Sequence, residues 1–224
     1  MYKSGFVILL VCLPSAVSWA QTDCSRKGGI AGTVVDTDAR PVVGAKVSIL
    51  SEECTVTGIE PGAVTDAHGR FLLTGVPVGL SGIYAQKPES GYPDTTGAIY
   101  LDDSALPPKV TVRSGDVIAG VVVRLGRKAG LVLGEVVDEE NLQPIVTARV
   151  KISLPDNERI MLSMATGRDG RFQLLLPTRP VRFIVYAPGY DAWQFTSSRE
   201  PAGIIRMESE ERRELSIKLH REKR

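Results

Sequence analysis

Apolar and polar residues alternate strictly along several short stretches of this chain. The stretch Ala45-Lys46-Val47-Ser48-Ile49 is one example, and the same alternation returns at 148–152, 121–125 and 215–220. A period of two residues places one set of side chains on a packed face and the other set in water. The pattern therefore predicts half-buried β-strands, and the last two stretches predict that each half of the chain ends on a strand.

Turn-forming residues separate these stretches. Asp, Asn, Gly and Pro gather at 36–41, 65–69, 138–141 and 167–170. Asp and Asn stabilise turns by bonding to nearby backbone, and Gly supplies a positive φ at no steric cost. With 22 Gly and 14 Pro spread along the chain, few windows could hold a helix of three turns. Many short strands at this spacing predict an all-β sandwich architecture.

The two halves of the chain repeat one another. Ten residues recur in the same order about a hundred positions later. The pairs are Gly32 and Gly134, Val34 and Val136, Asp36 and Asp138, Pro41 and Pro144, Ala45 and Ala148, Val47 and Val150, Gly69 and Gly170, Arg70 and Arg171, Phe71 and Phe172, and Pro77 and Pro177. The repeat predicts two tandem domains of usual size, at 21–127 and 128–224, joined near Gly126–Gly130.

The N-terminus has the features of a secretory signal peptide. Lys3 precedes an apolar run at 6–13, then Pro14, and Ser18-Trp19-Ala20 provides small residues at the cleavage positions. We expect residues 1–20 to be removed after Ala20 and the protein to be secreted or periplasmic. The alternative is a retained anchor, but this run falls well short of the roughly 20 apolar residues that span a bilayer. No later stretch is long and apolar enough to span, so no membrane span is expected in the mature chain.

Charge and cysteine content narrow the partners and the compartment. Without Lys3 the chain has as many basic as acidic residues, which argues against nucleic acid or an anionic membrane surface as partner. Cleavage also leaves two cysteines, Cys24 and Cys54, which in an oxidising compartment predict a disulfide. Closing a loop of about 30 residues would stabilise the first domain by about 3–4 kcal/mol. A reactive thiol or metal site is the alternative, although no histidine lies nearby in the sequence.

The chain offers little for catalysis. Its two histidines, His68 and His220, lie in different halves, and no Gly-x-Ser-x-Gly elbow accompanies either. No His or Cys cluster has the spacing of a zinc site, and no glycine-rich loop is suited to phosphate. Paired carboxylates such as Asp36 with Asp38 and Asp102 with Asp103 could in principle serve glycoside hydrolysis or bind calcium, but their positions fit solvated turns better. We predict no catalytic residues, no metal and no cofactor, so the protein is not expected to be an enzyme.

One long irregular segment, 87–109, has no counterpart of that length in the second half. Loops of this kind often carry specificity in sandwich domains. The simpler alternative is a surface loop without a ligand. Tyr92 and Tyr100 belong to this segment, and Tyr190 and Trp193 occupy the related region of the second half. These four are the candidate ligand contacts, because sugars and peptides stack on exposed rings. Each ring could instead cover the core.

Several of these residues form a recognisable pattern. Gly-x-Val-x-Asp at 32–36, Pro41 with Gly44-Ala45-x-Val47, and Thr65-Asp66-x-x-Gly69-Arg70-Phe71 followed by Val76-Pro77-x-Gly79 resemble the carboxypeptidase regulatory-like domain family. The resemblance covers nearly all of 28–126. It is looser over 130–221, where Thr147 replaces a glycine and Gly167 stands where the family often has Asp.

The resemblance implies two tandem antiparallel seven-stranded, Greek-key, transthyretin-like β-sandwich domains after the signal peptide. It also implies a non-catalytic module, since the peptidase half with its His-x-x-Glu motif is absent. We therefore expect a secreted interaction or scaffold module with an extracellular protein or glycan as partner. The alternative is a carbohydrate-binding module that uses the 87–109 loop. The sequence leaves the ligand and the oligomeric state open.

Overall fold

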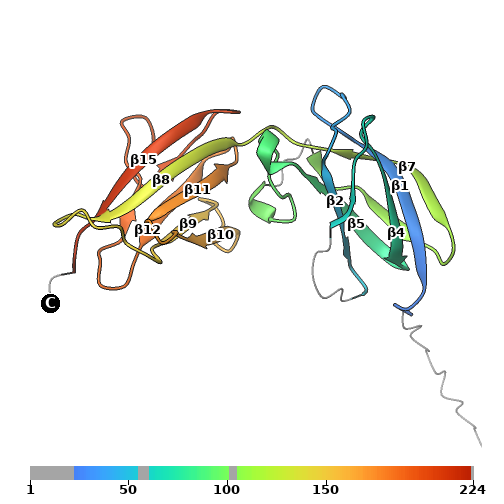
Figure 1. The fold of residues 1–224 in the computed structure, drawn as a ribbon, viewed down its shortest axis with the longest axis horizontal. Helices are drawn as coiled ribbons and strands as arrows, with labels where there is room; N and C mark the ends of the chain where they lie inside the picture. The colour runs from blue at the N-terminus through green and yellow to red at the C-terminus, as the bar shows by residue number, and fades with distance from the viewer. Residues whose placement is uncertain (1–22, 55–60, 101–104, 223–224) are drawn as a thin grey trace, which may run out of the picture.

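Two β-sandwiches lie one after the other along the long axis of the molecule (Figure 1). The computed structural model describes residues 23–54, 61–100 and 105–222, so the predicted signal peptide and its cleavage site lie outside the described residues. Strands between Lys27 and Arg124 build the first sandwich, and strands between Gly130 and Leu219 build the second. Among the described residues, no helix has the length and apolar character needed to cross a membrane.

The first sandwich pairs a three-stranded sheet with a four-stranded sheet. The smaller sheet has the order β4-β1-β7, and the larger has the order β3-β2-β5-β6. The strands are β1 (Lys27–Val35), β2 (Lys46–Ser51), β3 (Pro61–Val64), β4 (Arg70–Pro77), β5 (Gly79–Gln86), β6 (Lys109–Val112) and β7 (Val117–Arg124).

The second sandwich repeats this plan. Its smaller sheet has the order β11-β8-β15, and its larger sheet has the order β10-β9-β12-β13, with β14 also paired to β12. The strands are β8 (Gly130–Asp138), β9 (Arg149–Ser153), β10 (Met161–Ala165), β11 (Arg171–Leu176), β12 (Val181–Tyr186), β13 (Trp193–Gln194), β14 (Ile204–Ile205) and β15 (Arg212–Leu219).

The predicted all-β class and tandem sandwich architecture are confirmed. Two details differ from the expected seven antiparallel strands. The last strand of each sandwich runs parallel to the first, β7 to β1 and β15 to β8, because the chain enters it from the opposite sheet and needs no hairpin. Among the described residues the second sandwich has eight strands, since two short strands, β13 and β14, stand where the first sandwich has β6.

The repeated Gly-x-Val motif makes room for a core phenylalanine. Phe71 and Phe172 are buried, and each ring lies against the glycine that faces it on the neighbouring strand. A Cβ atom on Gly32 would come within 2.8 Å of the Phe71 ring, and one on Gly134 would collide with Phe172. Packing at this density leaves no space for a side chain at either glycine.

The hairpin turn before each of these phenylalanines has the expected conformation. Gly69 and Gly170 have φ values of 71° and 72°, a region that residues with a Cβ atom rarely adopt. In the first sandwich the Asp66 side chain accepts hydrogen bonds from the backbone amides of His68 and Arg70, at 2.8 Å each. The recurrence of this motif therefore has a structural cause.

The predicted Cys24–Cys54 disulfide is present, with 5.7 Å between the two Cα atoms. It joins the segment before β1 to the bend after β2. The Cys54 side chain is buried, and its Sγ lies 3.8 Å from the carbonyl oxygen of Val78, just beyond the end of β4.

Candidate functional site between the two sandwiches

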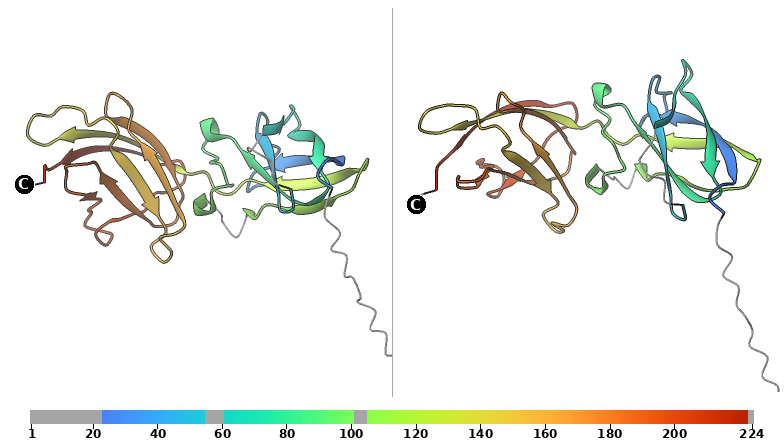
Figure 2. Two further views of the ribbon diagram at one scale, coloured as in Figure 1. Left: turned by 90° about the horizontal axis from the view of Figure 1, so that it is seen from below. Right: turned by 60° about the horizontal axis from the view of Figure 1, so that its bottom comes forward.

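Residues 87–100 of the long 87–109 segment lie between the two sandwiches in all views (Figures 1 and 2). The segment leaves the first sandwich after β5 and contains two short 3-10 turns, η1 (Pro88–Ser90) and η2 (Ala98–Tyr100). The η2 turn packs against β10 of the second sandwich. A loop that belongs to one domain by sequence therefore contacts the other domain.

Ile99 is the centre of this contact. Its side chain is 2% exposed, and it belongs to the apolar core of the second sandwich and not to that of the first. Complete burial of an aliphatic side chain of this size is worth about 1.5–3 kcal/mol. The first sandwich thus supplies part of the second sandwich's core.

Polar contacts fix the η2 turn on both sides of Ile99. The Tyr100 hydroxyl donates a hydrogen bond to the carbonyl oxygen of Leu175 at 2.8 Å. One guanidinium nitrogen of Arg179, in the turn between β11 and β12, donates to the carbonyl oxygens of Ala98 at 3.1 Å and Ile99 at 2.6 Å. We call these contacts of Ala98–Tyr100 with Leu175 and Arg179 the clasp.

Burial keeps Tyr100 in its hydrogen-bonding form. Desolvation, with a smaller effect of the nearby Asp94 carboxylate, raises the pKa of Tyr100 to about 12. The phenol therefore remains protonated near neutral pH and continues to donate to Leu175.

The linker between the sandwiches is fastened as well. The amide of Ala129 donates to the carbonyl oxygen of Gly91 at 2.8 Å. Lys128 lies 5.8 Å from the centre of the Tyr92 ring and pairs with Glu210 of the second sandwich, with 2.6 Å between Nζ and Oε1. The pair is largely exposed, so it contributes well under 1 kcal/mol. The buried Ile99 contact is the stronger part of the junction.

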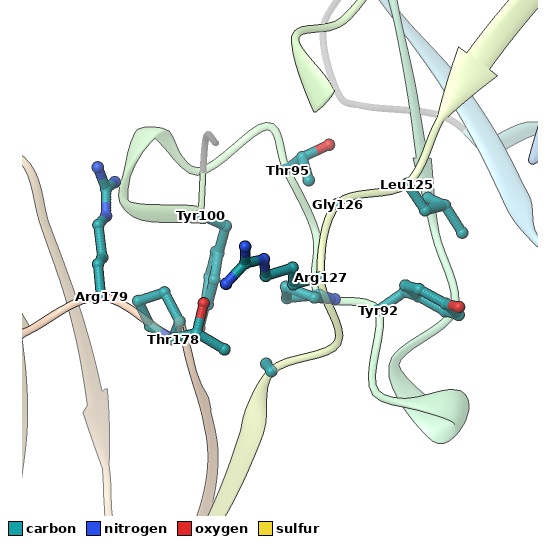
Figure 3. A pocket seen from close by; sticks show the side chains of 11 residues that line it. Tyr92, Thr95, Tyr100, Leu125, Gly126, Arg127, Thr178 and Arg179 are labelled. Carbon is teal, nitrogen blue, oxygen red and sulfur yellow. The ribbon is translucent and has the colours of Figure 1, made fainter. Parts of the chain in front are cut away.

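A cleft of about 270 Å³ remains between the loop, the linker and the β11–β12 turn (Figure 3). Tyrosine, threonine, proline and arginine side chains form most of its wall. The lining residues are Tyr92, Pro93, Thr95, Tyr100, Leu125, Gly126, Arg127, Ala129, Pro177, Thr178 and Arg179. Both domains and the linker contribute, so the cleft exists only when the sandwiches are in this arrangement.

The residues that line the cleft include basic but no acidic side chains, and the basic ones are Arg127 and Arg179. Arg127 is exposed and extends from the linker toward Tyr100 (Figure 3), and no residue in the described ranges forms an ion pair with it. Arg179 bonds to neutral carbonyl oxygens and forms no ion pair with a described residue, and the Asp94 carboxylate is near enough to Tyr100 to affect its pKa.

Two of the four candidate ligand contacts meet in this cleft. Tyr92 and Tyr100 both line it, but Tyr92 is only 9% exposed and its hydroxyl points away from Arg127 (Figure 3). Tyr100 is half-buried and held by the clasp. Neither side chain is fully exposed, and only Tyr100 is accessible over a sizeable part of its surface.

Tyr190 and Trp193 lie elsewhere in the second sandwich. The Tyr190 hydroxyl donates to the Asp138 carboxylate at 2.8 Å, and the Arg221 guanidinium lies 5.7 Å from the centre of the Tyr190 ring. Trp193 is half-buried and packs edge-on against Phe183 and Phe195, with ring centres 6.3 and 6.4 Å apart. Both rings have packing partners within their own domain.

Asp138, which holds Tyr190, is almost fully buried. Desolvation favours its neutral form, but hydrogen bonds from Tyr190, from Arg221 and from the backbone amides of Glu140 and Asn141 outweigh that effect and lower the pKa of Asp138 to about 2. The carboxylate joins the end of β8 to the C-terminal segment after β15.

The two histidines do not form a site. His68 lies in a turn of the first sandwich, and His220 lies at the end of the second, where Nδ1 is 3.0 Å from a carboxylate oxygen of Glu139. Both are exposed. Within 23–54, 61–100 and 105–222, no group of three or more His, Cys, Asp or Glu residues is arranged to hold a metal ion.

Sequence reasoning missed Ile99, Arg127 and Arg179. An apolar triplet, Ala98-Ile99-Tyr100, inside a segment rich in Pro, Asp, Thr and Gly is a signal that part of the loop is buried. The two arginines carry no such signal, because their positions depend on how the domains meet.

The geometry defines a tandem β-sandwich protein with a loop clasped between its domains. A sequence model of the carboxypeptidase regulatory-like domain matches residues 29–103, which agrees with the family resemblance of the sequence motifs. The match covers the first sandwich as far as the end of the η2 turn and just beyond. No curated protein matches the chain.

Several solved structures are similar to the chain at low identity. The shaft pilin SpaA from Lactobacillus rhamnosus GG is 12% identical, over 88% of this chain and 100% of that chain, with a TM-score of 0.38. A streptococcal ancillary pilin is 17% identical, over 89% and 64%, with a TM-score of 0.36. The Bacillus anthracis TIE protein is 14% identical, over 88% and 34%, with a TM-score of 0.36. The chain thus spans less than two thirds of the length of the last two proteins.

Proposed function

We propose that this chain is an exported, non-catalytic interaction module whose two domains present their surfaces to an extracellular protein or glycan in one fixed arrangement. The domains are 21–127 and 128–224, after a signal peptide at 1–20. The observation that carries the proposal is the burial of Ile99, from the first domain, in the core of the second. Domains joined only by a short linker would move relative to one another by default, and this contact opposes that motion.

Two features support export and a role without catalysis. The disulfide fits an oxidising compartment, and the N-terminal sequence fits a cleaved signal. In the part of the chain that the structure describes, no hydrogen bond joins a histidine ring to a serine or cysteine side chain, and the one hydrogen bond of a histidine ring is that of His220 with Glu139.

We also propose that the second domain is a second copy of the carboxypeptidase regulatory-like domain. Its strand order repeats that of the first, its first strand pairs antiparallel with β11 and parallel with β15, and Gly134 faces Phe172 as Gly32 faces Phe71. The looser motif at Thr147 and Gly167 falls in turns, where the chain tolerates variation.

Backbone ¹⁵N relaxation of the mature chain tests the fixed arrangement. Amides of both sandwiches should report one rotational correlation time, that of the whole molecule. In the Ile99→Asp variant the first and the second sandwich should show different, shorter correlation times, because a carboxylate cannot enter the apolar core and the loop would undock. Leu106→Asp is the matched control, since Leu106 lies in the same segment and is 61% exposed. Independent tumbling of the two sandwiches in the wild-type protein would refute the proposal.

The absence of catalysis has its own test. The mature protein should not hydrolyse a broad panel of ester, glycoside and peptide substrates. Hydrolysis that disappears in a His68→Ala or His220→Ala variant would show an enzyme and exclude this function.

A second candidate is glycan binding through the 87–109 loop. The placement of Tyr92 and Tyr100 in one cleft favours it. Because both rings are buried or half-buried, such binding would use the cleft and not an open aromatic platform.

A further inference from the structure

Two arginines and no carboxylate are found among the residues that line the cleft. On the rest of the described surface some basic side chains form ion pairs, such as Lys109 with Glu52 and Arg182 with Glu158, and others, such as Arg124, form none. In the cleft, Arg127 has no such partner among the described residues, and no lining residue is acidic. A concave site with unbalanced positive charge between two domains favours an anionic ligand.

One of the two guanidinium groups is already held in place. Arg179 is fixed by the carbonyl oxygens of Ala98 and Ile99, so its ordering is complete before any ligand arrives. A preorganised group loses less conformational entropy on binding than a free one. Arg127 is exposed and directed toward Tyr100, so its planar guanidinium group can donate two parallel hydrogen bonds to a carboxylate bound in the cleft.

The remaining wall suits a sugar ring. Thr95 and Thr178 offer hydroxyl groups that donate and accept hydrogen bonds, and Tyr100 offers an aromatic surface. The volume of about 270 Å³ is below that of typical drug-sized pockets, which begin at about 300 Å³. A single ring with its substituents is the size of ligand that the cleft accepts.

We propose that the interdomain cleft binds one uronic acid residue of an extracellular saccharide. Its carboxylate pairs with Arg127, its ring lies against Tyr100, and its hydroxyl groups bond to Thr95 and Thr178. The inference rests on the fixed domain arrangement of the proposed function, because the cleft forms only while the clasp holds the two sandwiches together.

The test uses the full mature chain and isothermal titration with tri-galacturonic acid. Its fully methyl-esterified form is the comparison ligand, since it keeps the rings and removes the charge. We expect the acid to bind at least tenfold more tightly than the ester, and the difference to shrink as salt is raised, because exposed charges are screened.

A pair of variants localises the binding. Arg127→Gln removes the charge without removing any contact seen in the described residues, and should weaken binding of the acid at least tenfold. Arg124→Gln is the matched control, because Arg124 is an exposed arginine near the end of β7 that does not line the cleft. It should leave binding unchanged.

Three results would overturn the inference: equal affinity for acid and ester, an Arg127→Gln variant that binds like wild type, or tighter binding of a short peptide with a free C-terminal carboxylate. The absence of binding in a protein whose sandwiches tumble together would also overturn it, while leaving the proposed function intact. Sandwiches that tumble independently would refute the proposed function, and the cleft with it.

Discussion

Replacing Ile99 by alanine should destabilise the second sandwich, although Ile99 belongs to a loop of the first. The side chain is 2% exposed within the second core. Buried isoleucine-to-alanine changes cost about 2–5 kcal/mol. The loop can relax more than a strand can, so we expect the lower part of that range, about 2–3 kcal/mol. This corresponds to a loss of roughly 30- to 150-fold in the equilibrium that favours the docked loop.

Tryptophan fluorescence makes this change measurable in one domain. The chain has two tryptophans, Trp19 in the predicted signal peptide and Trp193 in the second sandwich. Urea unfolding of the mature protein, followed by fluorescence, therefore reports the second sandwich through Trp193. The midpoint should fall in Ile99→Ala with an unchanged slope, because the extent of surface exposed on unfolding remains similar.

Leu106→Ala provides the control from the same loop. Leu106 is 61% exposed, and surface substitutions usually change stability by less than about 0.5 kcal/mol. If Ile99→Ala leaves the Trp193 transition within that limit, the loop does not support the second core and the reasoning fails.

Three further predictions concern the sandwiches themselves. Replacing Cys24 and Cys54 by alanine should lower the stability of the first sandwich by about 3–4 kcal/mol in calorimetry, and non-reducing mass mapping of the wild type should find the two joined. The folded-state pKa of Asp138, about 2, lies below its ordinary value of 3.8, so its contribution to stability is present above about pH 4 and is lost as the pH falls toward 2; Asp138→Asn should flatten the stability–pH curve there. Gly69→Ala should destabilise the first sandwich by more than about 1 kcal/mol in urea titrations, because alanine is strained at a φ of 71° and its Cβ would lie 2.9 Å from the Val34 carbonyl oxygen.

Two local features of the sequence, the alternation of apolar and polar residues and the position of the turn glycines, allowed much of the fold to be predicted. Alternation at 45–49 and 148–152 marks β2 and β9, whose inner residues are buried. The turn glycines Gly69 and Gly170 have the positive φ that their position before a core phenylalanine requires. These features depend on contacts within a few residues or between neighbouring strands, so the sequence pattern carries them directly.

The contacts of the long loop could not be predicted in the same way. Ile99 lies in the core of a domain that begins some thirty residues later, and no periodicity indicates such a partner. The loop is predicted to contribute tyrosines to a ligand site. The structure adds a contact that this prediction did not include, since the Tyr100 hydroxyl bonds to Leu175 of the other domain, and that contact depends on the arrangement of the domains and not on local pattern.

The parallel pairing of β7 with β1 and of β15 with β8 was missed for a related reason. Alternation shows which face of a strand is buried, but it does not show the direction in which a strand joins its sheet. That direction depends on where the chain crosses between sheets.

The disulfide and the clasp occupy matching places in the two sandwiches. Cys54 lies against Val78, just past the end of β4, while the η2 turn bonds to Leu175 and Arg179 around the end of β11. The place that receives a neighbour's loop in the second domain is closed by a covalent bond in the first. Within the described residues this docking mode therefore operates once, from the first sandwich to the second.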